Sequence, residues 1–187
     1  MDNLEVKRHT LSHVLAAAVQ ELYPHAKFGI GPAIDNGFYY DIDFGTTKIS
    51  DTDLAKLEKA MRRIISRKPK MTKRTVSRAD ALKWAKDNKQ TYKVELIEDL
   101  PKDEEVTFYD LGDAFTDLCK GPHAKDTSDL GVFKLDHIAG AYWRGDEKGK
   151  CSPAFTVSPS LPKKSLRHMR RDRRKPKNAT IVRLAPS

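Results

Sequence analysis

The chain has 187 residues, of which 39% are hydrophobic and 33% are charged, and its formal net charge is +9. This composition is typical of a folded, water-soluble protein, and no apolar run approaches the roughly 18 residues that a membrane-spanning helix needs. Two cysteines are too few for a disulfide framework. The composition therefore excludes a membrane protein and a disulfide-rich secreted scaffold, and we expect a reduced, cytoplasmic protein.

The positive charge is concentrated at the end of the chain. Residues 150–187 hold eleven Lys and Arg and one acidic residue, whereas residues 1–149 hold 24 basic and 25 acidic residues. The first 149 residues are thus almost neutral, and their bulk charge does not indicate nucleic-acid binding. The rest is basic and rich in proline, without any periodicity. We expect a folded domain over residues 1–150 and a disordered basic tail over 151–187.

The first part of the chain predicts a helix, a hairpin and a second helix. Leucines and valines repeat at helical spacing over residues 4–22, until Pro24 ends the helix. Asn36-Gly37 between apolar runs predicts a hairpin turn, and alternating apolar residues predict a strand over 38–44. Ser50 is typical of a helix start. The apolar face of the helix that follows is formed by Leu54, Leu57, Met61, Ile64 and Ile65.

The second part predicts one more helix and then a run of strands. Ser77 with Asp80 is typical of a helix start, and this helix is expected to end near Asn88. Strands are expected over residues 92–97, 106–111, 114–118 and 132–143. The order of helix, hairpin, two helices and several strands predicts an α+β fold, in which an antiparallel sheet packs against helices.

Two short motifs contain residues suited to chemistry. His9 and His13 are four residues apart, so they share one face of the first helix. Cys119 and His123 flank a Gly-Pro turn that can bring them together, and Asp117 shares a face with Cys119 on an extended segment. The set suits either a tetrahedral metal site or an acid–base cluster. A thiol nucleophile at Cys119 is a weaker hypothesis, because no other feature resembles a thiol hydrolase.

Five segments together resemble, in order and spacing, the editing domain of bacterial threonyl-tRNA synthetases, the second of that family's N-terminal domains. They read RHTLSHVLAAAVQELYP, FGIGPAIDNGFYYDID, TYKVEL, FTDLCKGPH and AGAYWRGDEKGK. The resemblance covers residues 4–150 and is shared in outline with alanyl-tRNA editing proteins. It implies the synthetase editing-domain fold, a cytoplasmic location and the acceptor end of tRNA(Thr) as partner, with no membrane. It also implies that the parent enzyme is a homodimer through other domains.

The resemblance implies hydrolysis of the ester of mischarged Ser-tRNA(Thr), as a fragment of threonine–tRNA ligase. It places the catalytic site at His9, His13, Lys93, Asp117, Cys119 and His123. It implies no cofactor for editing and leaves zinc open at the three histidines and the cysteine; the parent enzyme's ATP, Mg and Zn belong to a domain that we do not expect here. The alternatives are an inactive or RNA-binding remnant without the ATP-dependent aminoacylation domain, and a zinc-stabilised structural module.

Basic residues that could contact the acceptor stem are spread over three regions of the sequence. A solvated helix face is the simpler interpretation of those in the second helix. The candidates are Arg8, Lys120, Arg144, Arg62, Arg63, Arg67 and Lys68.

The tail departs from the family that the motifs resemble. The family continues with a short apolar strand, whereas this chain continues with CSPAFTVSPSLPKK after Lys150. Freely chosen codons for the tail, read from the third base of Lys150, give MLTGIYGVAF, which resembles the family's continuation. We therefore expect the tail to be out-of-frame translation, and the last strand of the sheet to be missing.

Overall fold

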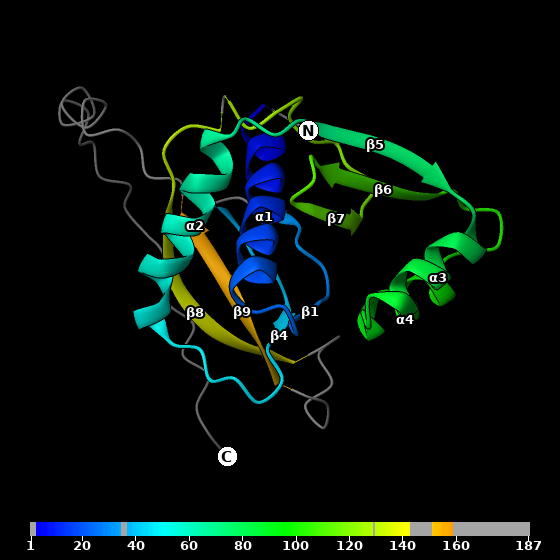
Figure 1. Ribbon diagram of the computed structural model, residues 1–187, viewed down its shortest axis with the longest axis horizontal. Helices are drawn as coiled ribbons and strands as arrows, with labels where there is room; N and C mark the ends of the chain where they lie inside the picture. Colours follow the sequence, from blue (N-terminus) through cyan, green and yellow to red (C-terminus); the bar gives the residue numbers. More distant parts are fainter. Residues whose placement is uncertain (1–2, 35–36, 129, 143–150, 159–187) are drawn as a thin grey trace, which may run out of the picture.

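Two helices lie side by side over an antiparallel sheet in the larger part of the molecule (Figure 1). The computed structural model describes residues 3–34, 37–128, 130–142 and 151–158. The helices are α1 (Asn3–Leu22) and α2 (Leu54–Ser66), the second preceded by a 3-10 turn, η1 (Asp51–Asp53). The sheet has the strand order β2-β3-β9-β8. Its strands are β2 (Ala33–Ile34), β3 (Gly37–Phe38), β9 (Cys151–Ser158) and β8 (Lys134–Tyr142).

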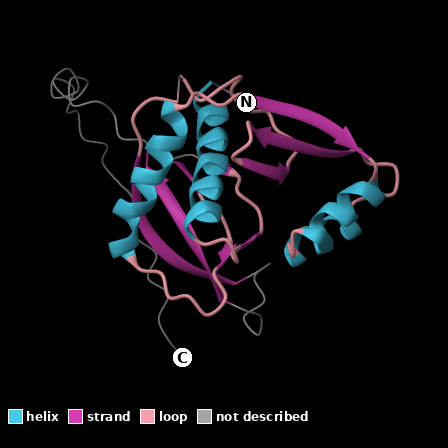
Figure 2. Cartoon of the chain, viewed as in Figure 1, coloured by secondary structure: helices cyan, strands magenta, loops and turns pink. Residues whose placement is uncertain are grey.

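The smaller part of the molecule is a three-stranded antiparallel sheet with a pair of helices at one end (Figure 2). Its strands are β5 (Met71–Val76), β6 (Val106–Leu111) and β7 (Phe115–Leu118), and its helices are α3 (Arg78–Asp87) and α4 (Thr91–Asp99). A separate two-stranded ladder, β1 (Lys27–Phe28) with β4 (Ile42–Asp43), belongs to the larger part.

Each part has its own hydrophobic core. The larger core is built around α1, which is buried continuously from Thr10 to Val19, as expected for a helix covered on all sides. The smaller core packs α3 and α4 on β6 through Ala81, Ala85, Ile97, Val106 and Phe108. Strand β7 lies between the two, because Phe115 packs in the larger core and Leu118 against the smaller one.

Most of the expected elements are confirmed. The first helix, the hairpin pairing around residues 35–36, the second helix with its buried face, and strand β6 lie where the sequence predicts them. Ser77 caps α3 by accepting a hydrogen bond of 3.0 Å from the backbone N–H of Asp80. The α+β class is confirmed as well.

Two expectations about secondary structure are wrong, and one strand was missed. Residues 92–97 lie in helix α4 and not in a strand, because Tyr92, Lys93 and Ile97 are buried together on one helical face. The strand expected over 38–44 is interrupted: β3 ends at Phe38 and β4 begins at Ile42. Strand β5 was not expected, because its residues are mostly exposed and lack an apolar alternation.

The boundary expected at residue 150 also needs correction. Cys151–Ser158 is strand β9, which pairs with β8 along its length and with β3 at Phe38. The sequence FTV within it, at residues 155–157, has the aromatic and β-branched residues that favour strands. The edge of β3 is therefore paired, whereas the sequence predicts a missing last strand. The remainder of the expected tail, residues 159–187, lies outside the described residues.

One arginine holds the end of α4. Arg78 donates hydrogen bonds to the carbonyl oxygens of Ile97 (2.5 Å), Leu100 (2.8 Å) and Pro101 (2.5 Å). We expect Arg78→Ala to lower the free energy of unfolding by about 2–3 kcal/mol, because carbonyls at a helix C-terminus lose a charged donor. Chemical denaturation measures this. Lys83→Ala, which removes an exposed pair with Asp87, is the control and should leave the midpoint unchanged.

Candidate functional site

The six residues predicted for the site come together between the two parts of the molecule. Helix α1 supplies His9 and His13, α4 supplies Lys93, and β7 supplies Asp117. The segment after β7 supplies Cys119 and His123. One potential ligand atom from each of His9, His13, Cys119 and His123 lies within 4.8 Å of the others. Lys93 Nζ lies 2.5 Å from Asp117 Oδ1, and Asp117 Oδ2 lies 3.9 Å from His13 Nε2.

The thiol of Cys119 lies between two imidazoles. Its Sγ is 3.4 Å from His9 Nε2 and 3.2 Å from His123 Nε2. On the other side of its ring, His9 Nδ1 lies 3.1 Å from the carbonyl oxygen of Pro122. A carbonyl accepts only, so this contact places the His9 proton on Nδ1 and leaves the Nε2 lone pair facing the sulfur.

Thr10 supports the site, although the sequence did not indicate it. Its fully buried Oγ1 accepts a 2.9 Å hydrogen bond from the N–H of Ala124 and lies 3.4 Å from His123 Nδ1. The hydroxyl donates to the carbonyl of Val6 at 2.9 Å. Thr10 thus ties α1 to the segment that holds His123. In the sequence, only the position of Thr10 between His9 and His13 could have indicated this role.

The turn after Cys119 requires glycine. Gly121 has φ +74°, and a Cβ added there would lie 2.3 Å from the hydroxyl oxygen of Tyr109. Its N–H lies 3.3 Å from Cys119 Sγ, and the Tyr109 ring packs on His123 with centroids 4.5 Å apart. The DLCKGPH motif therefore folds back because this glycine allows a close approach of backbone to ring.

The second half of the site is a buried ion pair. Lys93 and Asp117 are only 2% and 3% exposed, and Lys93 Nζ also donates to the carbonyl of Gly29 at 2.7 Å. The hydroxyl of Tyr40 donates to Asp117 Oδ2. The carboxylate therefore has a cation on one oxygen and a hydroxyl on the other, which compensates for its burial.

Tyr40 was predicted only as part of an apolar strand face. Its position is possible because Gly31 has no side chain: a Cβ there would lie 2.3 Å from the Tyr40 ring. Burial beside Asp117 raises the pKa of the Tyr40 hydroxyl well above its usual value, so it stays a donor. The hydroxyl of a fully buried tyrosine needs a hydrogen-bond partner. From the sequence, Tyr40 was placed on an apolar face, and the question of which residue that partner could be was not asked.

His13 is the most enclosed of the three histidines. It is 2% exposed, its ring centroid lies 4.2 Å from that of His123, and its Nδ1 has no hydrogen-bond partner within the described residues. Burial, the neighbouring His9 and the Lys93 cation all lower the pKa of His13 well below its usual value. His13 is therefore neutral at physiological pH and holds a lone pair.

Burial sets the charge of the rest of the cluster in the same way. It lowers the pKa of His9 and, more strongly, that of His123, with the neighbouring histidines adding to the effect at His123. It raises the pKa of the Cys119 thiol to about 11. In the absence of metal, the thiol is protonated at neutral pH, which argues against a thiolate nucleophile at Cys119.

The donor set fits a tetrahedral zinc ion after a small contraction. Tetrahedral bonds of about 2.0–2.1 Å to nitrogen and about 2.3 Å to sulfur separate the ligand atoms by about 3.3–3.6 Å. The two Cys119–imidazole distances, 3.4 and 3.2 Å, are close to this, while the largest separation in the set is 4.8 Å or less. The contact of His9 Nδ1 with a backbone carbonyl is the outer-shell partner that metal-binding histidines usually have.

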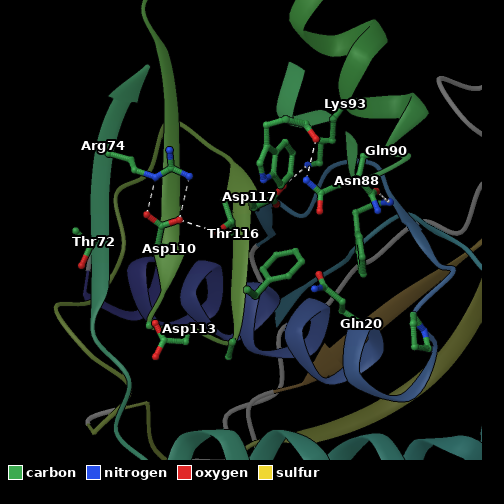
Figure 3. A pocket seen from close by; sticks show the side chains of 16 residues that line it. Gln20, Thr72, Arg74, Asn88, Gln90, Lys93, Asp110, Asp113, Thr116 and Asp117 are labelled. Atoms are coloured by element: carbon green, nitrogen blue, oxygen red, sulfur yellow. Dashed lines mark hydrogen bonds and ion pairs between the residues drawn. The ribbon is translucent and has the colours of Figure 1, made fainter. Parts of the chain in front are cut away.

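A polar cavity of about 840 Å³ reaches the ion pair from the side of α3 and β5 (Figure 3). Lys93 and Asp117 are among its lining residues, and the Arg74–Asp110 pair and Thr116 form another wall. A smaller hollow of about 160 Å³ approaches Cys119, with Ile30, Leu96, Leu118 and Lys120 around it. Lys93 and Asp117 are thus reached from one hollow and Cys119 from the other, whereas the three histidines line neither.

Comparison with known proteins decides which family this site belongs to. Residues 106–151 match the model of the threonyl and alanyl tRNA synthetase second additional domain. This is a second additional domain of the threonyl-tRNA synthetase type. The threonine–tRNA ligase of Acetivibrio thermocellus is 52% identical over 76% of this chain and 22% of its own length. Those of Finegoldia magna and Clostridium tetani are 48% and 49% identical, over 84% and 85% of this chain.

The recognition made from the five motifs is confirmed by these relatives. The chain spans about a quarter of the length of the ligases that it matches, at 22–25% of each. No helix in the described part of the chain has the length and apolar character needed to cross a membrane. Of the basic candidates, Lys120 pairs with Glu104, Arg62 with Glu58 and Arg63 with Glu21, while Arg144 lies outside the described residues.

Proposed function

We propose that this domain hydrolyses the ester that joins a seryl group to the 3′ end of tRNA(Thr). The observation that carries the proposal is the combination, in one enclosed site, of neutral imidazoles with the Lys93–Asp117 ion pair. Ester hydrolysis needs a base for the attacking water, a positive charge for the oxyanion and a group that holds the amino acid. Each of these three requirements has a candidate residue here. The partner in this proposal is the acceptor end of tRNA(Thr).

The histidines suit the role of positioning and deprotonating water. Their lowered pKa values keep them neutral, so a lone pair is available to accept the proton of water at neutral pH. His13 is the strongest candidate, because its Nδ1 is buried and has no partner within the described residues. His9 has its lone pair on Nε2 and lies nearer the surface, where it suits the terminal ribose.

Lys93 supplies the positive charge. Its ammonium group has three protons, one of which is donated to Gly29 O, while Asp117 Oδ1 lies 2.5 Å away as the ion-pair partner. A remaining proton can donate to the oxygen that becomes negative as water attacks the ester carbon. In an enclosed site such a donor is worth roughly a hundredfold to a thousandfold in rate.

Asp117 suits recognition of the seryl group. A carboxylate held by Lys93 and Tyr40 can accept from the amine or the hydroxyl of serine. Selection against threonine then depends on the extra methyl group, which the enclosed site excludes by size. Such a second sieve is needed because one methyl is worth only about 1–3 kcal/mol in a binding pocket.

The test is to follow deacylation of seryl-tRNA(Thr) and threonyl-tRNA(Thr) by the purified chain. We expect serine to be released at least tenfold faster than threonine, and His13→Ala to remove the serine activity. Circular dichroism of the variant controls for loss of fold. Equal rates for the two esters, or full activity in a folded His13→Ala variant, would contradict the proposal. Binding of both tRNAs without hydrolysis would identify an RNA-binding fragment instead.

The second candidate function is a zinc-stabilised structural module, in which His9, His13, Cys119 and His123 would hold the ion. Four ligands would complete its tetrahedral shell and would take up the lone pairs that the hydrolysis needs. In that case metal-depleted protein should take up one equivalent of Zn²⁺, with release of the Cys119 thiol proton, because the ligand is the thiolate. Competition with a chromophoric chelator measures the stoichiometry, and a pH indicator measures the proton. Cys119→Ser should weaken binding strongly, whereas Lys93→Met should not. A wild-type titration without a stoichiometric end point would exclude zinc.

A further inference from the structure

The seam between the two parts of the molecule is joined by side chains from the first turn of α4. Gln90, the residue before α4, accepts a 2.9 Å hydrogen bond from the N–H of Phe28 and donates at 3.2 Å to the carbonyl of Ala26. The other edge of β1 is occupied by β4. The side-chain amide of Gln90 therefore bonds a backbone N–H and a backbone carbonyl on the edge of β1 that β4 does not occupy, as an additional strand would.

Two further bonds come from the next residues along the chain. The Tyr92 hydroxyl donates to Asp43 Oδ2 at 2.9 Å, and Lys93 Nζ donates to the carbonyl of Gly29 at 2.7 Å. Asp43 is in β4 and Gly29 directly follows β1, so both acceptors belong to the same small ladder. One turn of α4 thus binds both strands of this ladder.

The buried apolar residues on the two sides of this contact belong to different clusters. The polar cavity of about 840 Å³ lies along the seam, with Gln90, Lys93 and Phe28 among its lining residues. Figure 3 shows Asn88, Gln90 and Lys93 together at one side of this cavity. The contact of α4 with the β1–β4 ladder is therefore made largely by directed hydrogen bonds.

We infer that Gln90 and Tyr92 are positioning residues, which clamp α4 on the β1–β4 ladder and so place the Lys93 ammonium group at Asp117. The inference rests on the proposed function for its effect on hydrolysis, but the placement itself does not. Lys93 has two contacts: it donates a hydrogen bond to the carbonyl of Gly29 across the seam, and it forms an ion pair with Asp117 in the site. When the clamp is removed, α4 can separate from the ladder, and the ammonium group leaves the place where charge develops.

Asn88 offers a matched control. It carries the same amide group, lines the same cavity and lies two residues before Gln90. Its side chain bonds within its own part of the molecule, donating to the carbonyl of Trp84 at 2.8 Å. Asn88→Ala therefore removes a side-chain amide near the seam and leaves every bond across the seam in place.

The first measurement is the rate at which acetic anhydride modifies Lys93 in the full chain, read by mass spectrometry of peptides. Lys93 is 2% exposed and should react slowly. We expect Gln90→Ala to increase its rate about tenfold, because two hydrogen bonds that hold the seam closed are lost. Tyr92→Phe should increase it less. Asn88→Ala should leave it unchanged, and the exposed Lys83 gives the internal reference rate in every variant.

The second measurement separates positioning from binding. For hydrolysis of seryl-tRNA(Thr), we expect Gln90→Ala to lower kcat about tenfold and to change KM less than twofold, because Lys93 acts on the transition state. In a Lys93→Met background, the same Gln90 change should have no further effect on kcat. If kcat of the double variant is reduced by the product of the two single reductions, Gln90 acts independently of Lys93.

The outcomes distinguish the inference from the proposed function. If Lys93 stays protected in a folded Gln90→Ala variant, or if Asn88→Ala exposes it equally, the clamp is overturned whatever the activity. If the wild type hydrolyses no aminoacyl ester while Gln90→Ala still exposes Lys93, the clamp holds and the proposed function fails. A Gln90→Glu variant serves if Gln90→Ala does not fold. It keeps the acceptor for Phe28, loses the donor to Ala26, and should give an intermediate labelling rate.

Discussion

Lys93→Met is expected to lower kcat for hydrolysis of seryl-tRNA(Thr) about a hundredfold to a thousandfold and to lower the free energy of unfolding by about 3–5 kcal/mol. The lysine neutralises Asp117 at a place where both side chains are almost fully buried. Removal of the cation leaves a carboxylate in a medium of low dielectric, which still accepts from the Tyr40 hydroxyl and has the neutral His13 ring 3.9 Å away. Denaturant unfolding measures the stability, and deacylation kinetics measure the activity.

A second substitution separates the two effects. Asp117→Asn in the Lys93→Met background removes the uncompensated charge and keeps an oxygen to accept from Tyr40. We expect this double variant to recover most of the lost stability, because no buried charge is left, but none of the hydrolysis. Equal stability of wild type and Lys93→Met would mean that water reaches Asp117 freely. Recovery of hydrolysis in the double variant would remove Lys93 from the mechanism.

Helix α4 shows why periodicity alone could not place Lys93. In TYKVEL, apolar and charged residues alternate, so a strand would put Lys93 beside Glu95 on a solvated face. The structure buries Lys93 with Tyr92 and Ile97 on one side of a helix, while Glu95 is exposed. The burial of a lysine is favourable only because Asp117, 24 positions further along the chain, lies opposite it. Only the resemblance to a family of editing domains indicated this residue.

The histidines and the cysteine were easier to foresee. His9 and His13 share a helical face by spacing alone, and a Gly-Pro turn brings His123 back towards Cys119. What spacing could not supply was the contact of Thr10 in α1 with the segment after β7, and the contact of Tyr40 with Asp117. Thr10 and Tyr40 are buried polar groups whose partners lie far away in the sequence. Partners of that kind emerge from tertiary packing, and local patterns do not contain them.

The enclosed histidines predict that the domain loses stability in mild acid. In the folded protein burial lowers the pKa values of His13 and His123, whereas in the unfolded chain both titrate near 6.5. Below that pH the unfolded state therefore binds more protons than the folded state, and the free energy of unfolding falls as the pH falls. Above pH 6.5 both states are neutral at these positions, and the effect vanishes.

For the two histidines together we expect a loss of about 3 kcal/mol between pH 7.5 and 5.5, at roughly 1.4 kcal/mol per pH unit for each once the pH is below 6.5. Urea unfolding at a series of pH values, with a chelator present, measures the slope. His123→Asn should reduce it by about one proton, because that side chain no longer titrates. A slope that is the same in wild type and variant would mean that His123 binds its proton equally well in the folded and the unfolded state, so that burial does not lower its pKa. The ring would then be open to solvent, and the enclosed histidine cluster on which the proposed hydrolysis depends would not include His123.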